Sequence, residues 1–484
     1  MGYVHTVELL IKNGFLITLD PERRVYRDGA VAYEGDRIVA VGKTGDLGKE
    51  HGSESVIDAR GKIVMPGLVN AHSHLFAMFS RGLGADGSRG RAREVREYSW
   101  DIERLSLLDR EICYASAALA ALEMIRSGIT TTQDSHYINF HGDAIDGVAE
   151  AVVDSGMRVV LGRGCWDAPG LAPPEVTEDV SRAVRETEKF IRQWGGAGEG
   201  RVNVRVEASM LAQCTDEMFL ATKDLARRLG VGWATHLQYR LATSGTDPRR
   251  DDPALGRYNG RAVEYMEDLD VLGPDSLLIH CTHVEGREIR ILARTGTPVA
   301  HCPIANAWGG NPVVTPVPAM LERGVTVGLG TDSVATNDSL DLFQAMKICA
   351  LIHKVNMGSS AAMTAEKVLE MSTIDSAKAL GLASEVGSLE PGKRADVILL
   401  DMDYPGMVPS FNPVKNLVYG LGGGGAVDTV IIGGETVMGG RAVMTLDETE
   451  VYRRAEEVGR NLLRRLGRLG PDAPHVEPSP WKLE

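Results

Sequence analysis

Through the middle of the chain, short apolar runs alternate with longer segments in which apolar residues recur every three or four positions. The short runs are typical of buried parallel strands, and the longer segments are typical of amphipathic helices that cover them. A helix is predicted over 108–127, with Gly128 directly after it as a C-terminal stop. Eight strands are predicted, at 63–70, 129–135, 157–163, 202–209, 231–237, 276–281, 297–302 and 325–331. This order predicts a closed (β/α)8 TIM barrel.

At both chain ends the sequence pattern is different and predicts short strands and tight turns. Residues 7–14 and 29–42 predict hairpins, which we expect to turn at Asn13-Gly14 and at Gly35-Asp36. Further short strands are predicted near the C-terminus, at 395–400 and 427–434. Two similar strand-rich ends around a different middle predict one small β-sandwich domain that both termini build.

These patterns divide the chain into three parts. A length of 484 residues is too great for one small core and fits a large barrel with an accessory domain. The predicted parts are a composite β-sandwich domain over 1–61 and 386–446, a barrel over 62–385, and a C-terminal helix and tail over 447–484.

The composition narrows the class of partner. A hydrophobic content of 43% and a charged content of 24% are ordinary for a globular protein, and a net charge of −14 disfavours nucleic acid and anionic membranes. No apolar run approaches the roughly 20 residues of a membrane span. The six cysteines are scattered without a C-x-x-C pair, which favours reduced thiols. We expect a cytoplasmic homo-oligomer that acts on a small molecule.

Histidines and one aspartate stand at the predicted strand ends. His72 and His74 close the first strand, and residues i and i+2 of an extended chain point to the same side, so the small Ser73 is expected to turn away. His236 and Asp332 end the fifth and eighth strands. The sixth and seventh strands end in 280–283 (His-Cys-Thr-His) and in His301.

These side chains are suited to a metal. Functional groups of a parallel barrel collect at the C-terminal ends of its strands. Three histidines and one carboxylate make a site for Zn²⁺ or Fe²⁺ with one position left for water, whose pKa the metal lowers toward about 7.

Five segments carry a resemblance to a known family. The chain resembles the amidohydrolase superfamily, in the branch that holds cytosine and guanine deaminases, S-adenosylhomocysteine deaminase and s-triazine hydrolases. The match runs nearly end to end and is specific for the branch, not for the substrate. The segments are 66–74 (Pro-Gly-Leu-Val-Asn-Ala-His-Ser-His), 123–131, 301–306 (His-Cys-Pro-Ile-Ala-Asn), 330–333 (Gly-Thr-Asp-Ser) and 387–396.

The resemblance implies a role for each of these residues. Asp332 would also take the proton of the nucleophilic water, His283 would lie beside the metal and orient water or substrate, and His301 would contact substrate. A count along the strand end places His280 opposite to His283, so we expect His280 to be structural. The implied metal ligands are His72, His74, His236 and Asp332.

Two features of this sequence bear on the chemistry. Binuclear members of the superfamily carry a bridging lysine in strand 4, and residues 202–213 contain no lysine, so one divalent metal per chain is expected, zinc first and Fe²⁺ or another transition metal as the alternative. The related deaminases have a proton-shuttling glutamate three residues after the strand-5 histidine, where this chain has Tyr239. A tyrosine with a pKa near 10 is a poor proton shuttle at neutral pH.

The predicted substrate contacts lie in the loops. Gln238 and Tyr239 follow the fifth strand, and Trp308 follows the seventh. Phe79 and Trp100 belong to a long insertion after the first strand. Several aromatic side chains at the mouth of a barrel suit a flat, largely neutral heterocycle.

Three hypotheses follow. The leading one is a mononuclear hydrolase in which a metal-bound hydroxide displaces a leaving group, at a C–N bond or a similar one, from a small heterocyclic, urea-like or carbamate-like substrate. The second is an aminohydrolase of a nucleobase-like or triazine heterocycle, in which another acid such as Glu207 or Glu103 replaces the missing glutamate. The third is a non-catalytic relative, which the complete ligand set disfavours.

Overall fold

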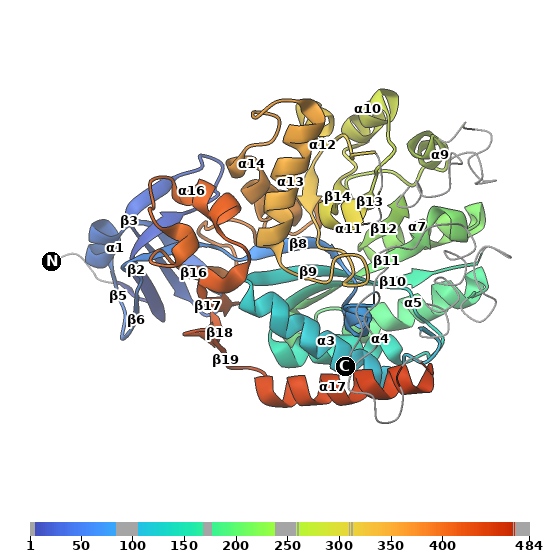
Figure 1. Ribbon diagram of the computed structural model, residues 1–484, viewed down its shortest axis with the longest axis horizontal. Helices are drawn as coiled ribbons and strands as arrows, with labels where there is room; N and C mark the ends of the chain where they lie inside the picture. The colour runs from blue at the N-terminus through green and yellow to red at the C-terminus, as the bar shows by residue number, and fades with distance from the viewer. Residues whose placement is uncertain are drawn as a thin grey trace, which may run out of the picture.

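The structure is a computed structural model that describes residues 5–83, 105–167, 177–237, 258, 261–308, 310, 313–467 and 469. Its centre is the predicted barrel of eight parallel strands, which hydrogen-bond in chain order from β8 to β15 (Figure 1). The strands are β8 (Leu68–Ser73), β9 (Ile129–His136), β10 (Arg158–Cys165), β11 (Val202–Met210), β12 (Gly232–Leu237), β13 (Ser276–His280), β14 (Val299–His301) and β15 (Val327–Leu329).

Helices surround this barrel, as the alternating pattern predicts. Helix α3 (Arg110–Arg126) begins at Asp109, whose side chain accepts from the amide of Ile112 at 2.9 Å, and Gly128 beyond its end has a φ of +81°. The other main helices are α4 (Ala144–Ser155), α5 (Val180–Trp194), α7 (Asp216–Leu229), α9 (Ala262–Asp268), α10 (Gly286–Thr295), α11 (Pro303–Trp308), α12 (Val317–Glu322), α13 (Leu342–Met357), α14 (Ala365–Met371) and α15 (Ile374–Ala379).

The barrel closes between its first and last strands. The side chains of Asn70 and Thr331 meet across this seam: Nδ2 of Asn70 donates to Oγ1 of Thr331 at 2.8 Å, and the amide of Thr331 donates to Oδ1 of Asn70 at 2.9 Å. A parallel bridge then pairs Ser73 with Asp332. The seam therefore brings the end of β15 beside the two histidines at the end of β8.

The prediction of a single barrel strand over 63–70 is wrong. It divides at Gly67 into β7 (Lys62–Pro66), which belongs to the second sheet, and β8. A Cβ on Gly67 would lie 2.1 Å from Oγ1 of Thr130, so a larger residue does not fit where the chain changes sheets. The other seven strands agree with the prediction to within a few residues.

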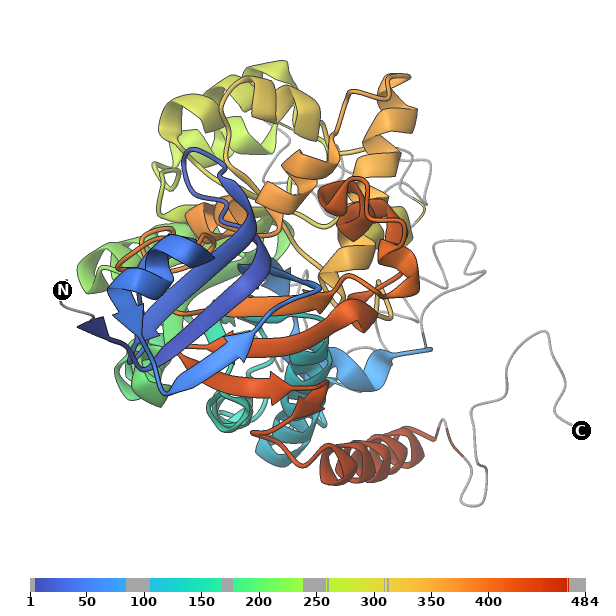
Figure 2. The ribbon, with the colours of Figure 1, turned by 90° about the vertical axis from the view of Figure 1, so that its left-hand side faces the viewer.

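Both chain ends build the second sheet, as the sequence predicts (Figure 2). Its strands alternate between two buried layers: Val397 and Leu399 share a core with Val31 of β3, whereas Ile398 and Leu400 face the main core. The strands are β2 (Leu9–Ile17), β3 (Val25–Glu34), β4 (Arg37–Lys43), β6 (Ser55–Asp58), β7, β16 (Val397–Asp401), β17 (Val427–Ile432), β18 (Glu435–Gly439) and β19 (Ala442–Val443).

One predicted turn is absent from this sheet. The hairpin between β3 and β4 turns at Gly35-Asp36 as expected, but β2 continues through Asn13-Gly14 to Ile17. Asn13 has a φ of +66°, and the register against β3 shifts between Ile11 and Gly14. The Asn-Gly pair is therefore an irregularity inside one strand, because the apolar residues after it still have a place in the core.

Helix α17 (Glu448–Arg465) is the predicted C-terminal helix and packs along α3 (Figure 1). It buries Val458 and Leu462, and Arg126 of α3 donates to Glu448 at 2.6 Å. Across the described ranges, we find no helix whose length and apolar character would let it cross a membrane.

Candidate metal centre

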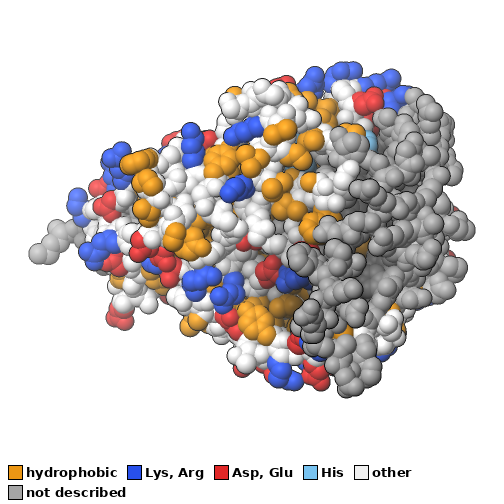
Figure 3. Space-filling view, in the orientation of Figure 1, with side chains coloured by type: hydrophobic (Ala, Val, Ile, Leu, Met, Phe, Trp, Pro, Cys, Tyr) orange, Lys and Arg blue, Asp and Glu red, His pale blue; other side chains and the backbone are white. Residues whose placement is uncertain are grey.

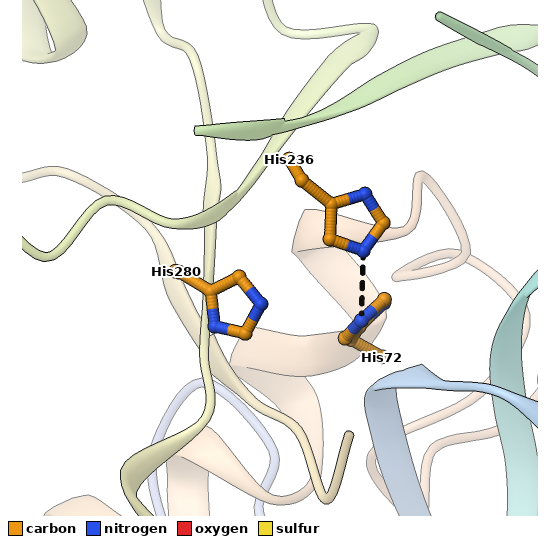
Figure 4. Close-up of side chains that lie close together, drawn as sticks. All are labelled: His72, His236 and His280. Atoms are coloured by element: carbon orange, nitrogen blue, oxygen red, sulfur yellow. Dashed lines mark hydrogen bonds between the residues drawn. The ribbon is translucent and has the colours of Figure 1, made fainter. Parts of the chain in front are cut away.

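Three histidines from two strands converge at one end of the barrel, and Figure 4 shows two of them, His72 and His236, with their ε nitrogens facing each other. His72 and His74 come from the end of β8 and His236 from β12, and all three are at most 5% exposed. The hydroxyl of Ser73 points away and donates to the carbonyl of Gln133 at 2.8 Å, as the strand alternation predicts.

Each of these imidazoles has its δ nitrogen against an oxygen. Nδ1 of His74 lies 2.7 Å from the carbonyl oxygen of Ser135, and Nδ1 of His236 lies 2.7 Å from that of Ser209. Nδ1 of His72 lies 2.9 Å from Oε1 of Gln133. A carbonyl oxygen only accepts, so the proton of each ring is assigned to Nδ1 and the ε nitrogen offers a lone pair to the centre.

The ligand atoms are spaced as around one small cation. Nε2 of His72 lies 3.3 Å from Nε2 of His236, and Oδ1 of Asp332 lies 3.3 Å from Nε2 of both His72 and His74. Two ligand atoms about 2.0–2.1 Å from a zinc ion at the tetrahedral angle lie roughly 3.3–3.4 Å apart. Facing lone pairs at this distance repel one another without a cation, so these four residues fit a metal of the zinc class.

Asp332 reaches the centre through an unusual backbone conformation. Its φ is +62°, in the left-handed region, and its amide donates to the carbonyl of His72 at 3.0 Å. That conformation costs a non-glycine residue on the order of 1 kcal/mol, and such strain is concentrated at functional sites. The turn directs the carboxylate at the histidines.

Burial favours neutral rings at the centre, although Asp332 outweighs burial at His74 and raises the pKa of that ring. Burial lowers the pKa of His236 well below its usual value and that of His280 to about 3, so both rings are neutral at pH 7. Burial alone would raise the pKa of Asp332, but the rings of His72 and His74 that face its Oδ1 outweigh this effect and hold that pKa well below its usual value. Neutral imidazoles and an ionised carboxylate are the ligating forms.

The expectation that His280 is structural is wrong. Its Nε2 lies 3.7 Å from Oδ2 of Asp332, and its ring is 5.8 Å from that of His72 between centroids (Figure 4). Leu277 and Ile279 face the barrel interior, so alternation would turn His280 outward, but His280 and Cys281 have φ values of +72° and +46°. This left-handed turn invalidates the count along the strand.

His283 is half-buried beyond the end of β13. Within the described ranges, the groups of metal-ligating side chains that include His280 do not include His283. The role predicted for His283 is therefore better suited to His280.

His301 is turned away from the centre. Ala300 faces the barrel interior, so the next side chain points outward to α13, where Nε2 of His301 lies 3.3 Å from Nε2 of His353. Cys302, one residue further, lies with His280 and Asp332 instead. This geometry does not favour the substrate contact predicted for His301.

The aromatic side chains near the centre differ from those predicted. Phe79 packs against Gly459 of α17, and Trp308 is 39% exposed at the end of α11. The rings of Phe76 and Tyr137 lie 5.7 and 5.3 Å from that of His74, and Tyr137 stacks on Trp166 at 5.2 Å. The last two directly follow β9 and β10, and reading those strand ends could have found them. Gln238, Tyr239 and Trp100 lie outside the described residues.

The chain belongs to the amidohydrolase family. The family model, described as the Amidohydrolase family, matches residues 63–437, which include all eight barrel strands and the return to the second sheet. The chain is therefore a hydrolase that acts on carbon–nitrogen bonds other than peptide bonds.

Among curated proteins, the chain is similar to two groups of deaminases along nearly its whole length. The 5'-deoxyadenosine deaminase of Methanosarcina mazei is 35% identical over 462 residues, which are 95% of this chain and 99% of that protein. The 5-methylthioadenosine/S-adenosylhomocysteine deaminase of Syntrophobacter fumaroxidans is 34% identical over 455 residues, which are 94% of this chain and 98% of that protein.

Solved structures share the fold. An adenosine deaminase from Xanthomonas campestris with bound zinc superposes with a TM-score of 0.84 at 24% identity, covering 96% of this chain and all of that one. Atrazine chlorohydrolase from Arthrobacter aurescens TC1, complexed with zinc, gives a TM-score of 0.82 at 24% identity and covers 93% and 100% of the two chains. At this identity the likeness establishes the fold alone.

Proposed function

We propose that this protein is a mononuclear, zinc-dependent hydrolase that removes an exocyclic amino group, or a comparable leaving group, from a small heterocycle. The observation that carries the proposal is three separations of 3.3 Å, between Nε2 of His72 and Nε2 of His236 and between Oδ1 of Asp332 and Nε2 of both His72 and His74. A zinc ion bound there supplies an activated water, because zinc lowers the pKa of a coordinated water to about 7.

Asp332 and His280 divide the proton chemistry. Oδ1 of Asp332 is engaged by His72 and His74, whereas Oδ2 faces Nε2 of His280 at 3.7 Å. We assign the general base to Asp332, because its carboxylate is ionised and aimed at the centre. His280, whose Nδ1 lies 3.1 Å from Oδ1 of Asn306, orients the water or the substrate.

The substrate class comes from the relatives and the rings beside the centre. Phe76, Tyr137 and Trp166 give this end of the barrel flat apolar walls, which suit an aromatic heterocycle. Relatives at 33–35% identity carry names of adenosine-type deaminases. An adenosine substituted or reduced at the 5' carbon is therefore the first substrate to test.

Tyr239 favours a second candidate. A ring amino group leaves well only after it and the ring nitrogen are protonated, and a tyrosine supplies that proton poorly at neutral pH. A substrate with a more readily departing group, such as an activated triazine, urea or carbamate, does not need the shuttle. For the same reason we predict weak or no turnover of cytosine and guanine.

One substrate panel tests the proposal and separates the candidates. Zinc-loaded enzyme is assayed for ammonia release from 5'-deoxyadenosine, 5'-methylthioadenosine, S-adenosylhomocysteine, cytosine and guanine, and for product from chloro- and alkylamino-triazines, ureas and carbamates. Turnover of the adenosines supports the first candidate, and turnover of only the activated compounds supports the second. Absence of zinc-dependent turnover across the panel contradicts both.

Tyr239→Phe isolates the tyrosine hydroxyl on whichever substrate is turned over. Unchanged activity assigns no catalytic role to that hydroxyl, and only the missing glutamate then matters. A cytoplasmic location, a homo-oligomeric state, the domain boundaries and the absence of nucleic-acid or membrane partners stay predictions.

A further inference from the structure

A buried chain of polar side chains stands behind one metal ligand. Nδ1 of His72 meets Oε1 of Gln133 at 2.9 Å, and Nε2 of Gln133 donates to Oε1 of Glu207 at 2.6 Å. All three side chains are 0% exposed. His74 and His236 bond to backbone carbonyls instead, so His72 is the one of these three whose support depends on side chains.

Glu207 determines which way the amide of Gln133 faces. A carboxylate oxygen without a proton only accepts, so the NH₂ end of Gln133 has to face Glu207. The amide oxygen then faces His72 and accepts the proton of its Nδ1. This leaves Nε2 of His72 as the lone pair that points into the centre. A backbone carbonyl cannot turn over in this way, so the other two histidines need no such device.

The surroundings hold one oxygen of the carboxylate in place. The hydroxyl of Ser135 donates to Oε1 of Glu207 at 3.0 Å and accepts from Nε2 of Gln133 at 3.0 Å. On the neighbouring strand β10, a Cβ on Gly162 would lie only 2.2 Å from Oε1 of Glu207. Burial raises the pKa of Glu207 to about 7, because a buried charge is costly to keep.

We propose that Glu207 is a positioning residue that acts through Gln133 to fix His72 in the tautomer and orientation that bind the metal. This inference rests on the metal centre of the proposed function. It replaces the hypothesis that Glu207 is the acid that substitutes for the missing deaminase glutamate. Its Oε1 is already occupied by Gln133 and Ser135, and its Oε2, which has no hydrogen-bond partner among the described residues, is buried with the rest of the side chain.

Glu207→Gln is the direct test, because the new amide can donate to Gln133 and lets that side chain turn over. Zinc affinity is measured by competition with a chromophoric chelator at pH 7.5. We expect zinc to bind 10- to 100-fold more weakly than to the wild type, as for loss of other outer partners of ligating histidines. The matched control is Glu288→Gln, which alters an equally buried glutamate that caps α10, away from the centre. If the zinc affinity of Glu207→Gln is within twofold of the affinities of the wild type and of Glu288→Gln, the proposal is overturned.

A double-variant cycle tests the route through Gln133. If Glu207 acts only through that amide, adding Glu207→Gln to Gln133→Ala weakens zinc binding no further. Additive losses overturn the route. If Glu207→Gln does not fold, Gly162→Ala provides the test. It displaces the carboxylate of Glu207 without removing it and is also expected to weaken zinc binding. Wild-type affinity in folded Gly162→Ala then counts against the proposal.

Two outcomes separate this inference from the proposed function. With saturating zinc and substrate, Glu207→Gln should keep kcat within a few-fold of the wild type, whereas loss of a proton-shuttling acid lowers it by about 10² or more. A large fall in kcat at full zinc occupancy therefore overturns the positioning role. Failure of the wild-type protein to bind zinc contradicts the proposed metal centre itself, and this result needs no variant.

Discussion

Among the described residues there are two clusters of buried histidines, and one of these two is arranged to hold a metal. In the first cluster, around His72, the ε nitrogens converge and each δ nitrogen meets an oxygen. In the second, which consists of His301, His353 and Cys349 between β14 and α13, Nε2 of His301 also lies 3.3 Å from Nε2 of His353. The nitrogen separation is therefore the same in both.

The two clusters differ in what the δ nitrogens of their rings contact. Nδ1 of His301 and Nδ1 of His353 have no hydrogen-bond partner among the described residues, so nothing fixes their tautomers. The second cluster also has no carboxylate to balance the charge of a cation. Burial lowers the pKa of His353 to about 4, which keeps it neutral. Proximity of imidazoles alone does not make a metal site; outer oxygen partners and a carboxylate do.

The largest expected difference between the clusters is in metal content. The wild-type protein should hold one zinc per chain, and a chelator should abolish activity that added zinc restores. His236→Ala should leave well under one equivalent, because it removes a ligand, whereas His353→Leu should still hold one. Elemental analysis of each purified protein is the measurement. Two equivalents in the wild type, one of them lost in His353→Leu, would make the second cluster a metal site and contradict the comparison.

Removal of the carboxylate should stop turnover. Asp332→Asn loses both a ligand and the proposed general base, so we expect kcat/KM on the active substrate to fall by at least about 10². Cys349→Ser is the matched change in the second cluster and should leave kcat/KM within a few-fold. Near-normal turnover by Asp332→Asn would show that the base lies elsewhere.

The two histidines at the end of β13 should differ next. His280→Ala is expected to lower kcat by about 10² with zinc largely retained, because His280 lies beside Asp332. The same change at His283 should have a much smaller effect. Steady-state kinetics with metal analysis checks both variants, and a severe loss confined to His283→Ala would restore the role that the sequence assigned to it.

The smallest effect concerns stability against pH. The folded pKa of His353 is lowered to about 4, below its value of about 6.5 in an unfolded chain, so the stability linked to its neutral form is present above pH 6.5 and is lost as the pH falls toward 4. Between pH 7 and pH 5 this amounts to roughly 2 kcal/mol. Urea unfolding of the zinc-loaded wild type and of His353→Leu should show a shallower loss in the variant. Parallel curves would mean that His353 is not neutral in the folded state.

Much of the fold could be read from the sequence, because its signals are local. The alternation of apolar runs and amphipathic helices predicts the order of strands and helices in the barrel. The residues that begin and end α3, Asp109 and Gly128, can also be recognised in the sequence. The shared texture of the two ends predicts that they form one unit. The boundary at Gly67 was missed because residues on both sides of it are equally apolar, and only the packing on Thr130 divides them.

The candidate ligands His72, His74, His236 and Asp332 stand at predicted strand ends, and the resemblance to the amidohydrolase family selected them from the other strand-end histidines. The sequence alone could not decide which of the neighbouring histidines face the centre. His280 points into the barrel because its φ is positive. At the end of β14 the alternation of sides continues, so His301 points outward and Cys302 points inward. Backbone conformation at a strand end is set by the packing around it.

Only the tertiary structure decided what stands behind the ligands. Gln133 and Glu207 lie 74 positions apart in the chain and look like ordinary polar positions in buried strands, yet they meet at 2.6 Å behind His72. Strand ends are local features that a sequence displays, whereas contacts between strands depend on the register and closure of the whole barrel.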